Sequence, residues 1–288
     1  MNEKFQKIIS NTAYQKALAL FVLFLIVYFP VFPRLIHAWE IKPQSSHGYF
    51  IIPICLWLLW RRKEALSSLA PQATSIGTLF LAVGMFLCVT GNVLVADTVI
   101  NLSMMFSLAG IIISCLGFVF FRTVLFPFVF LVFMFPVPDA VYLSITSPMK
   151  LFVSDIATFV IRMMGISVFQ DGNILQMVNF KMEVVEACSG LRSLVTYVML
   201  GVLMSDFMEC QLWKKIILIS CALPIAILIN VIRITGTGIL ANTFGEQMAQ
   251  GFFHEFSGVI TFIIGLVIFI FILKLLTHDS NVRTDKVT

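Results

Sequence analysis

Long apolar stretches follow one another along most of this chain, separated by short polar connections. Each is roughly 15 to 23 residues long, and about 20 helical residues cross the apolar core of a bilayer. Because lipid offers no hydrogen-bonding partners, the backbone of such a stretch has to bond internally, which favours helices. Only 12% of the residues are charged, against about 25% in soluble domains. These features predict an all-α membrane protein that crosses the bilayer several times.

We expect about eight transmembrane helices. Their predicted ranges are 17–33, 49–60, 76–96, 99–120, 123–137, 189–205, 216–234 and 256–276. The second is short for a full span and is expected to begin near Gly48 or to be shielded by its neighbours. No small-residue cleavage site follows the first, which is interpreted as an uncleaved membrane helix. Residues 1–277 are expected to form one integral membrane domain, and residues 278–288 a short polar cytoplasmic tail.

The distribution of lysine and arginine predicts that both termini lie in the cytoplasm. With eight spans and an inner N-terminus, twelve of the nineteen basic residues fall on the inner side, and seven on the outer side or its rim. The strongest anchor is the run Trp60-Arg61-Arg62-Lys63, an interfacial tryptophan followed by three cations. The net charge of +4 is too small and too dispersed to indicate a nucleic-acid partner.

The region between the fifth and sixth predicted helices differs from the rest, and both of its ends lie outside in this topology. Residues 140–166 have a helical pattern interrupted by three charged residues, which predicts a helix in or near the outer interface. The sequence Asp-Gly-Asn at 171–173 is a turn signal, and residues 180–185 alternate like a strand. We therefore expect a small extracytoplasmic hairpin that leads directly to Cys188.

Six cysteines are present, with no C-x-x-C pair and no Cys/His set of zinc-like spacing. We expect no disulfide framework, no metal and no cofactor. Cys188 differs from the others because it begins the sixth predicted helix and has Arg192 four residues on, on the same face. A helix start and a nearby cation favour the thiolate, the reactive form of cysteine. Simple packing is the alternative for Cys188 and the expected role of the other five.

Alternating helix directions place three unusual polar groups at the outer membrane level. They are Cys188, Arg233 at the outer end of the seventh predicted helix, and His254 just before the eighth. Each has a structural alternative: an arginine can be a topological anchor or a salt-bridge partner, and a histidine can simply bond a carbonyl. Asn230 is a polar neighbour of Arg233 in the sequence. Glu186 either orients the histidine or an arginine, or is an ordinary interfacial acid.

Cysteine, arginine and histidine at one level suit acyl transfer. A thiolate that attacks a carbonyl gives an acyl-thioester, and a fixed cation stabilises the charge that develops on the carbonyl oxygen. The leaving amine has to be protonated. If a bound amine reacts with the thioester before water does, the result is transpeptidation, and a dry site at the bilayer surface slows the reaction with water.

Three separated blocks resemble the signature motifs of the exosortase/archaeosortase family of polytopic membrane transpeptidases. They are EACSGLRSL (186–194), NVIRI (230–234) and HEFSG (254–258). The stretch SSHGYFIIPICLWLLWRRK (45–63) resembles the Ser-His-Gly segment of bacterial exosortases, which is followed by a proline-containing helix. The similarity covers roughly residues 45–275, and the order and spacing of the three blocks make it specific.

The resemblance implies roles for the three polar groups. Cys188 would be the nucleophile and the carrier of the acyl-thioester. Arg233 would donate a proton or stabilise the oxyanion, and His254 would stabilise the transition state or assist proton transfer. The supporting candidates are Arg192, Glu186 and Asn230.

The resemblance also implies the partners and the location. Family substrates are secreted proteins whose C-terminal tail has a short motif such as Pro-Glu-Pro, then a membrane helix, then a basic cluster. The acceptor amine is not identified by the family. The enzyme would lie among the lipids of the bacterial inner membrane with its active site facing the periplasm, and bacterial members are linked to exopolysaccharide and surface-protein export.

Other functions stay open at this point. A transporter or channel for a polysaccharide or lipid intermediate is one alternative, although the charged groups gather at the outer rim rather than in the helix centres. A scaffold of an export complex is another, for which Cys188 would be dispensable. A plain cysteine protease would release a free carboxylate, whereas a transpeptidase adds the mass of its acceptor.

Overall fold

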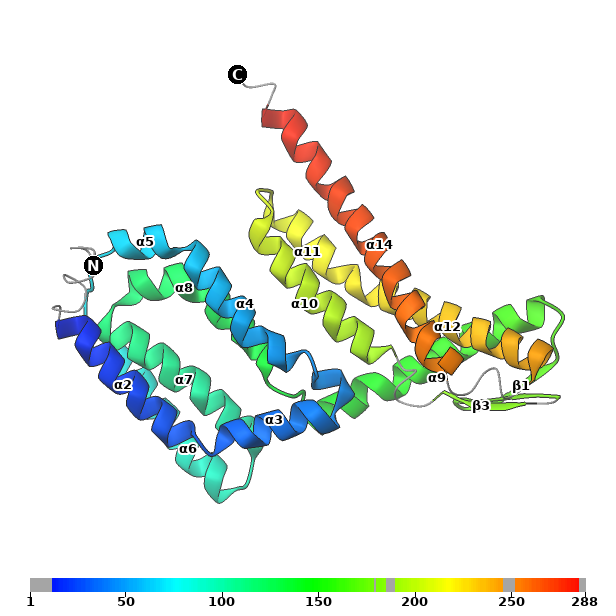
Figure 1. Ribbon diagram of the computed structural model, residues 1–288, viewed down its shortest axis with the longest axis horizontal. Coiled ribbons are helices and arrows are strands. Elements are labelled where there is room, and N and C mark those ends of the chain that lie inside the picture. Colours follow the sequence, from blue (N-terminus) through cyan, green and yellow to red (C-terminus); the bar gives the residue numbers. More distant parts are fainter. Residues whose placement is uncertain (1–11, 179, 185–189, 246–251, 285–288) are drawn as a thin grey trace. The chain divides into compact units, whose positions relative to one another are not determined.

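The computed structural model (Figure 1) is helical throughout, apart from one small sheet within the residues that it describes. The described residues are 12–178, 180–184, 190–245 and 252–284 of the 288-residue chain. The side chains of 252–256 and 278–284 are not among the described parts. The chain divides into two compact units, Met1–Pro136 and Val137–Thr288, and each is described by itself.

The first unit consists of apolar helices joined by short connections. In chain order they are α2 (Thr12–Tyr28), α3 (Val31–Ile41), η1 (Pro43–Ser45), α4 (Gly48–Arg61), α5 (Lys63–Ser68), α6 (Ile76–Val93), α7 (Asp97–Cys115), α8 (Phe118–Phe130) and η2 (Leu131–Met134). The predicted first span, 17–33, is two helices bent by 60°. Pro30 lies at this break, where a proline has no amide to continue the helical hydrogen bonds.

The second unit combines long helices with the sheet. Its elements are α9 (Asp139–Met163), β1 (Val168–Asp171), β2 (Ile174–Met177), β3 (Lys181–Glu183), α10 (Leu191–Phe207), α11 (Leu212–Ser220), α12 (Ala222–Phe244) and α14 (Phe252–Thr284). The sheet lies at the C-terminal ends of α9 and α12 (Figure 1). One hydrophobic core joins the buried sides of α9, α10, α12 and the sheet.

Five helices of the described residues are long and apolar enough to cross a membrane, or six if the bent pair α2 and α3 is one span. The five are α6, α7, α9, the run Leu212–Phe244 and the part Ser257–Thr277 of α14. The stretch Phe118–Met134 is shorter, and the predicted spans 49–60 and 189–205 are α4 and α10, with 14 and 17 residues. The all-helical, multi-pass membrane fold is confirmed, with shorter helices at some of the eight predicted positions.

The helix predicted at 140–166 forms α9. Its buried side chains recur every three or four residues, as expected for one face of a helix. They include Tyr142, Thr146, Met149, Val153, Ala157 and Ile161. Of the five candidate spans α9 has the lowest mean hydropathy, 1.2 against 3.0 for Ser257–Thr277. Its length also suits a membrane crossing, and a position in the outer interface stays a prediction.

The predicted hairpin is present and carries a third strand, and its extracytoplasmic position stays a prediction. The order is β1-β2-β3, with antiparallel neighbours. Gly172, in the predicted turn, has φ +59, a value that glycine adopts without a steric cost. One face of the sheet belongs to the core through side chains such as Leu175, which is fully buried. The other face is exposed, as in Phe169 and Lys181.

In the first unit, α6 and α7 pack at very short range through glycines spaced seven residues apart. A Cβ built on Gly84 would lie 2.8 Å from the backbone nitrogen of Ser107, and one on Gly77 would lie 2.5 Å from the Cα of Ser114. Small residues allow membrane helices to approach in this way. The hydroxyl of Tyr28 on α2 binds Ser107 at 3.0 Å, which ties a third helix to the pair.

Valine at position 84 is therefore expected to destabilise the first unit by about 1–3 kcal/mol, the usual cost of overpacking. Thermal unfolding in detergent would measure the loss. The control is Ala82→Val on the same helix, because Ala82 is exposed and added methyl groups there meet lipid or detergent. Equal unfolding temperatures for the two variants would contradict the close packing.

Two side chains before α4 donate hydrogen bonds to consecutive backbone carbonyls of η2, near the C-terminal end of the first unit. Trp39 donates its indole N–H to the carbonyl of Met134 at 2.9 Å, and His47 Nε2 donates to that of Phe133 at 3.0 Å. Gly48 lies against the Trp39 ring. His47 lies in the connection between η1 and α4, and burial lowers its pKa below the usual 6.5, although backbone hydrogen bonds to Phe133 and Gln44 oppose the shift.

A lowered histidine pKa makes stability depend on pH with a definite sign. The unfolded chain binds a proton at His47 near pH 6.5, and the folded chain does so only at lower pH, so acid favours the unfolded state. Stability from this group is complete above pH 6.5 and is expected to fall as the pH drops toward the folded-state pKa. A His47→Gln variant keeps a hydrogen-bond donor but does not titrate. Its unfolding temperature should therefore fall less than that of the wild type between about pH 7.5 and about pH 5, values on either side of the usual histidine pKa.

Candidate active site

The predicted site residues divide into those with described side chains and those without. The described ones are Arg192, Asn230 and Arg233. Cys188 and Glu186 lie outside the described residues, and His254 lies in the first turns of α14, outside the part whose side chains are described.

The start of α10, three residues after Cys188, packs directly on α12. Gly190 precedes the helix with φ +78, a left-handed conformation that a residue with a Cβ adopts only at a cost. A Cβ built there would lie 3.3 Å from the Cβ and Cγ of Asn230 and 3.2 Å from Cε of Met149. Asn230 is only 3% exposed. Glycine thus lets the turn after Cys188 lie against the Asn230 amide.

Arg233 extends from the same side of α12 toward α14. It follows Asn230 by three residues, so the two side chains are neighbours on the helix surface. A Cβ built on Gly258 of α14 would lie 3.7 Å from Cζ and Nη2 of Arg233, and the Nε of Arg233 is buried. Gly258 is four residues after His254, which is about one helical turn. The guanidinium therefore lies beside α14, about one turn from the His254 position.

Contacts farther along the helices fix their directions. The hydroxyl of Tyr197 on α10 donates to the carbonyl of Phe262 on α14 at 3.0 Å. At the other end Lys214 on α11 donates to the carbonyl of Leu276 at 2.9 Å. Since Gly258 is near Arg233 and Leu276 is near Lys214, α14 runs opposite to α11 and α12. The alternating directions expected for these helices are confirmed.

Arg233 is not at the end of its helix, which corrects the predicted boundary at residue 234. α12 continues to Phe244, where Gly245 with φ +88 follows it. The polar and small residues after Arg233 reflect packing rather than a helix end: Thr235 is buried, and a Cβ on Gly238 would lie 3.1 Å from Ile161 of α9. Gly238 lets α9 and the sheet approach α12.

The two arginines of the site differ in their surroundings. Arg192 is exposed on α10. Arg233 has its Nε buried and lies between α12 and α14. A guanidinium held in a protein interior is placed to stabilise a developing negative charge. This favours Arg233 over Arg192 as the principal cation.

Two residues of this region were not predicted. Met149 contacts the Gly190 turn, and Gly258 leaves the space beside Arg233. The only sequence signal was that Gly258 lies in the HEFSG block.

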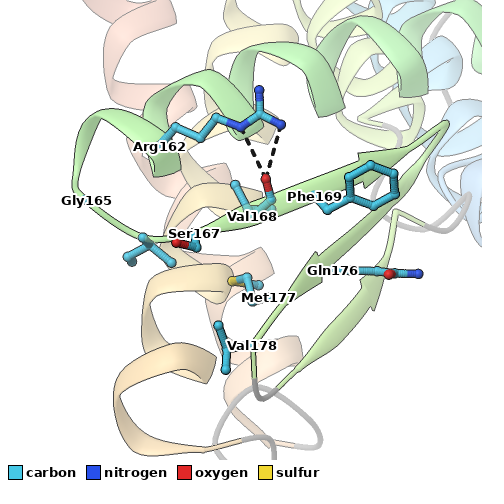
Figure 2. A pocket seen from close by; sticks show the side chains of 9 residues that line it. Arg162, Gly165, Ser167, Val168, Phe169, Gln176, Met177 and Val178 are labelled. Atoms are coloured by element: carbon cyan, nitrogen blue, oxygen red, sulfur yellow. Dashed lines mark hydrogen bonds between the residues drawn. The ribbon is translucent and has the colours of Figure 1, made fainter.

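Within the residues described, no group of three or more His, Cys, Asp or Glu side chains is arranged to hold a metal ion. A separate hollow of about 680 Å³ lies at the α9–β1 connection (Figure 2).

Comparison with known proteins gives one family. The family model described as Transmembrane exosortase (Exosortase_EpsH) matches residues 39–271, which is well over half of the chain. The match includes the three blocks around positions 188, 233 and 254. No curated protein and no solved structure gives a significant match.

Proposed function

Because the chain belongs to the transmembrane exosortase family, we propose that it is a cysteine transpeptidase that removes the C-terminal sorting tail of exported proteins. The observation that supports this most is the setting of Arg233. Its guanidinium lies beside α14 about one turn from the His254 position, and Asn230, one turn before it, contacts the backbone that follows Cys188. In this proposal, three segments far apart in the sequence would supply the groups that acyl transfer needs.

In the proposed reaction, the sulfur of Cys188 attacks the scissile carbonyl carbon. The carbonyl oxygen becomes an oxyanion, which Arg233 stabilises as a charge-assisted hydrogen-bond donor. The C–N bond then breaks, and the leaving amine takes a proton, for which His254 is the proposed donor. An acyl-thioester remains on Cys188. An acceptor amine attacks it, returns a proton to His254, forms a new amide and releases the Cys188 thiolate.

The proposed substrate is a secreted protein whose tail has a short motif, a membrane helix and a basic cluster. The basic cluster would stay in the cytoplasm, as the positive-inside rule requires. The motif would then reach the outer side of the bacterial inner membrane, where we place Cys188, with both termini of the chain inside. Burial of the substrate helix in lipid keeps the scissile bond at the height of the site.

The proposal is tested with a reporter protein that is exported and ends in a Pro-Glu-Pro motif, an apolar helix and a basic cluster. It is expressed in a bacterial host together with this chain or with an empty vector. We expect a shortened reporter only in the presence of the chain, and mass spectrometry of its new C-terminus should show the added mass of an acceptor. A reporter that stays full-length would contradict the sorting activity, and a free carboxylate would indicate hydrolysis instead of transfer.

A further inference from the structure

The backbone hydrogen bonds that frame β3 define which of its groups face β2. Met177 and Phe180 exchange hydrogen bonds in both directions, at 2.8 and 3.4 Å. At the other end of the strand, the amide of Val184 donates to the carbonyl of Asn173 at 2.8 Å. Bonded and non-bonded pairs alternate along antiparallel strands. The register between these two pairs is therefore fixed.

Alternation turns the backbone of Lys181 and Glu183 away from β2. Leu175 lies opposite Met182 in the register, and this is the bonded pair between the two end pairs. The N–H and C=O groups of Lys181 and Glu183 hence point to the outer edge of the sheet, away from β2. Among the described residues, no backbone hydrogen bond reaches this edge from another element, and both side chains are exposed.

The opposite edge of the sheet is occupied by α9. The same alternation directs the carbonyl of Val168 on β1 outward, and Arg162 donates to it from Nε at 3.2 Å and from Nη2 at 3.1 Å (Figure 2). Farther along this strand, the Gln170 side chain donates to Asp155 of α9 at 2.6 Å. A new strand could pair with β1 only by displacing Arg162, so the two edges are not equivalent.

We propose that the β3 edge binds the substrate, whose extended segment before the scissile bond pairs with Lys181–Glu183 as a fourth strand. This inference rests on the proposed function and adds the place where the peptide binds. An edge strand recognises a peptide through main-chain hydrogen bonds. Cys188 is five residues after Glu183, a reach of at most about 18 Å. A peptide on this edge would therefore lie within that reach of its proposed nucleophile.

The edge is short and charged, which explains how it can stay free. Short edge strands and charged side chains such as those of Lys181 and Glu183 oppose pairing between copies of a protein. Three residues alone bind a peptide weakly. A substrate held in the same membrane by its own helix has a high effective concentration at the edge, so a few hydrogen bonds are enough to orient it.

Proline at position 181 provides the test, because it removes the outward N–H and leaves the pairing of β2 with β3 intact. The matched control is Lys181→Ala, which loses the same side chain but keeps the N–H. With the reporter described above, we expect Lys181→Pro to process roughly three- to tenfold more slowly than Lys181→Ala, the effect of about one net hydrogen bond. Membrane abundance and unfolding temperature of the two variants are measured in parallel.

A proline scan of the six reporter residues before its motif gives a second result that uses the unaltered enzyme. An added strand predicts that processing falls at two of these positions, two residues apart, because only the substrate amides opposite Lys181 and Glu183 face β3. Equal processing rates for Lys181→Pro and Lys181→Ala would overturn the added strand. If Lys181→Pro does not accumulate in the membrane, a proline scan without this period of two would overturn it instead. Failure of the wild-type chain to process the reporter would instead contradict the proposed function itself.

Discussion

A Cys188→Ala variant is expected to leave the sorting reporter at full length. Alanine cannot form the acyl-thioester, and loss of a nucleophile lowers turnover by orders of magnitude, about 10³-fold or more. The fraction of shortened reporter on an immunoblot, with the membrane abundance of the variant measured beside it, gives the result. Undiminished processing would exclude Cys188 as the nucleophile.

Cys210→Ala is the matched control for this change. Cys210 is a partly exposed free cysteine in the connection between α10 and α11, and no role in the site is assigned to it. We expect near-normal processing from this variant. Alkylation with a thiol reagent before the assay should abolish activity in the wild type and in Cys210→Ala to the same extent, since both retain Cys188.

The second large effect is expected from Arg233→Ala, at about 10²- to 10³-fold slower processing. This is the usual loss when one donor to a developing oxyanion is removed. Arg233→Lys should retain part of the activity, because lysine keeps the charge but lacks the planar arrangement of donors. Arg192→Ala is expected to cost less than either, since the Arg192 side chain is exposed. A smaller loss from Arg233→Ala than from Arg192→Ala would reverse the assignment.

Unfolding temperature separates chemistry from structure in this series. The Nε of Arg233 is buried, so removal of the side chain can also weaken the packing of α12 on α14. A catalytic role predicts that Arg233→Lys, which fills much of the same space, unfolds near the wild-type temperature and still processes slowly. If the Arg233→Lys variant folds normally and processes the reporter at the wild-type rate, the planar arrangement of guanidinium donors is not needed.

Local patterns predicted the elements well where the determinants are local. The Asp-Gly-Asn turn and the alternation after it correctly indicated the sheet, and apolar length indicated the membrane helices. The bend after Tyr28 was missed, although Pro30 and Pro33 are visible in the sequence, because apolar length outweighed them. The end of α12 was also misplaced: Gly238, beyond Arg233, packs on α9 and the sheet, a contact between distant segments that no local pattern reveals.

The site shows the same limit. The order and direction of the helices are enough to predict that Arg233 and the start of α14 share one level, and the contact of Arg233 with Gly258 agrees with this. The contact of Gly190 with Asn230 was not predictable in the same way. It depends on the left-handed turn at Gly190 and on how closely α10 and α12 approach, which only the packed structure provides.

The spacing of two cations along α11 and α12 bears on the length of the substrate tail that the proposed function requires. Lys214 and Arg233 are nineteen positions apart in the run Leu212–Phe244, or about 28 Å at 1.5 Å per residue, close to the thickness of the hydrocarbon layer. Under the proposed function, the two charges would mark the length that suits the membrane helix of a substrate. A tail helix one turn too long would carry its cleavage motif about 5 Å past the arginine, so the enzyme would select substrates by helix length as well as by motif.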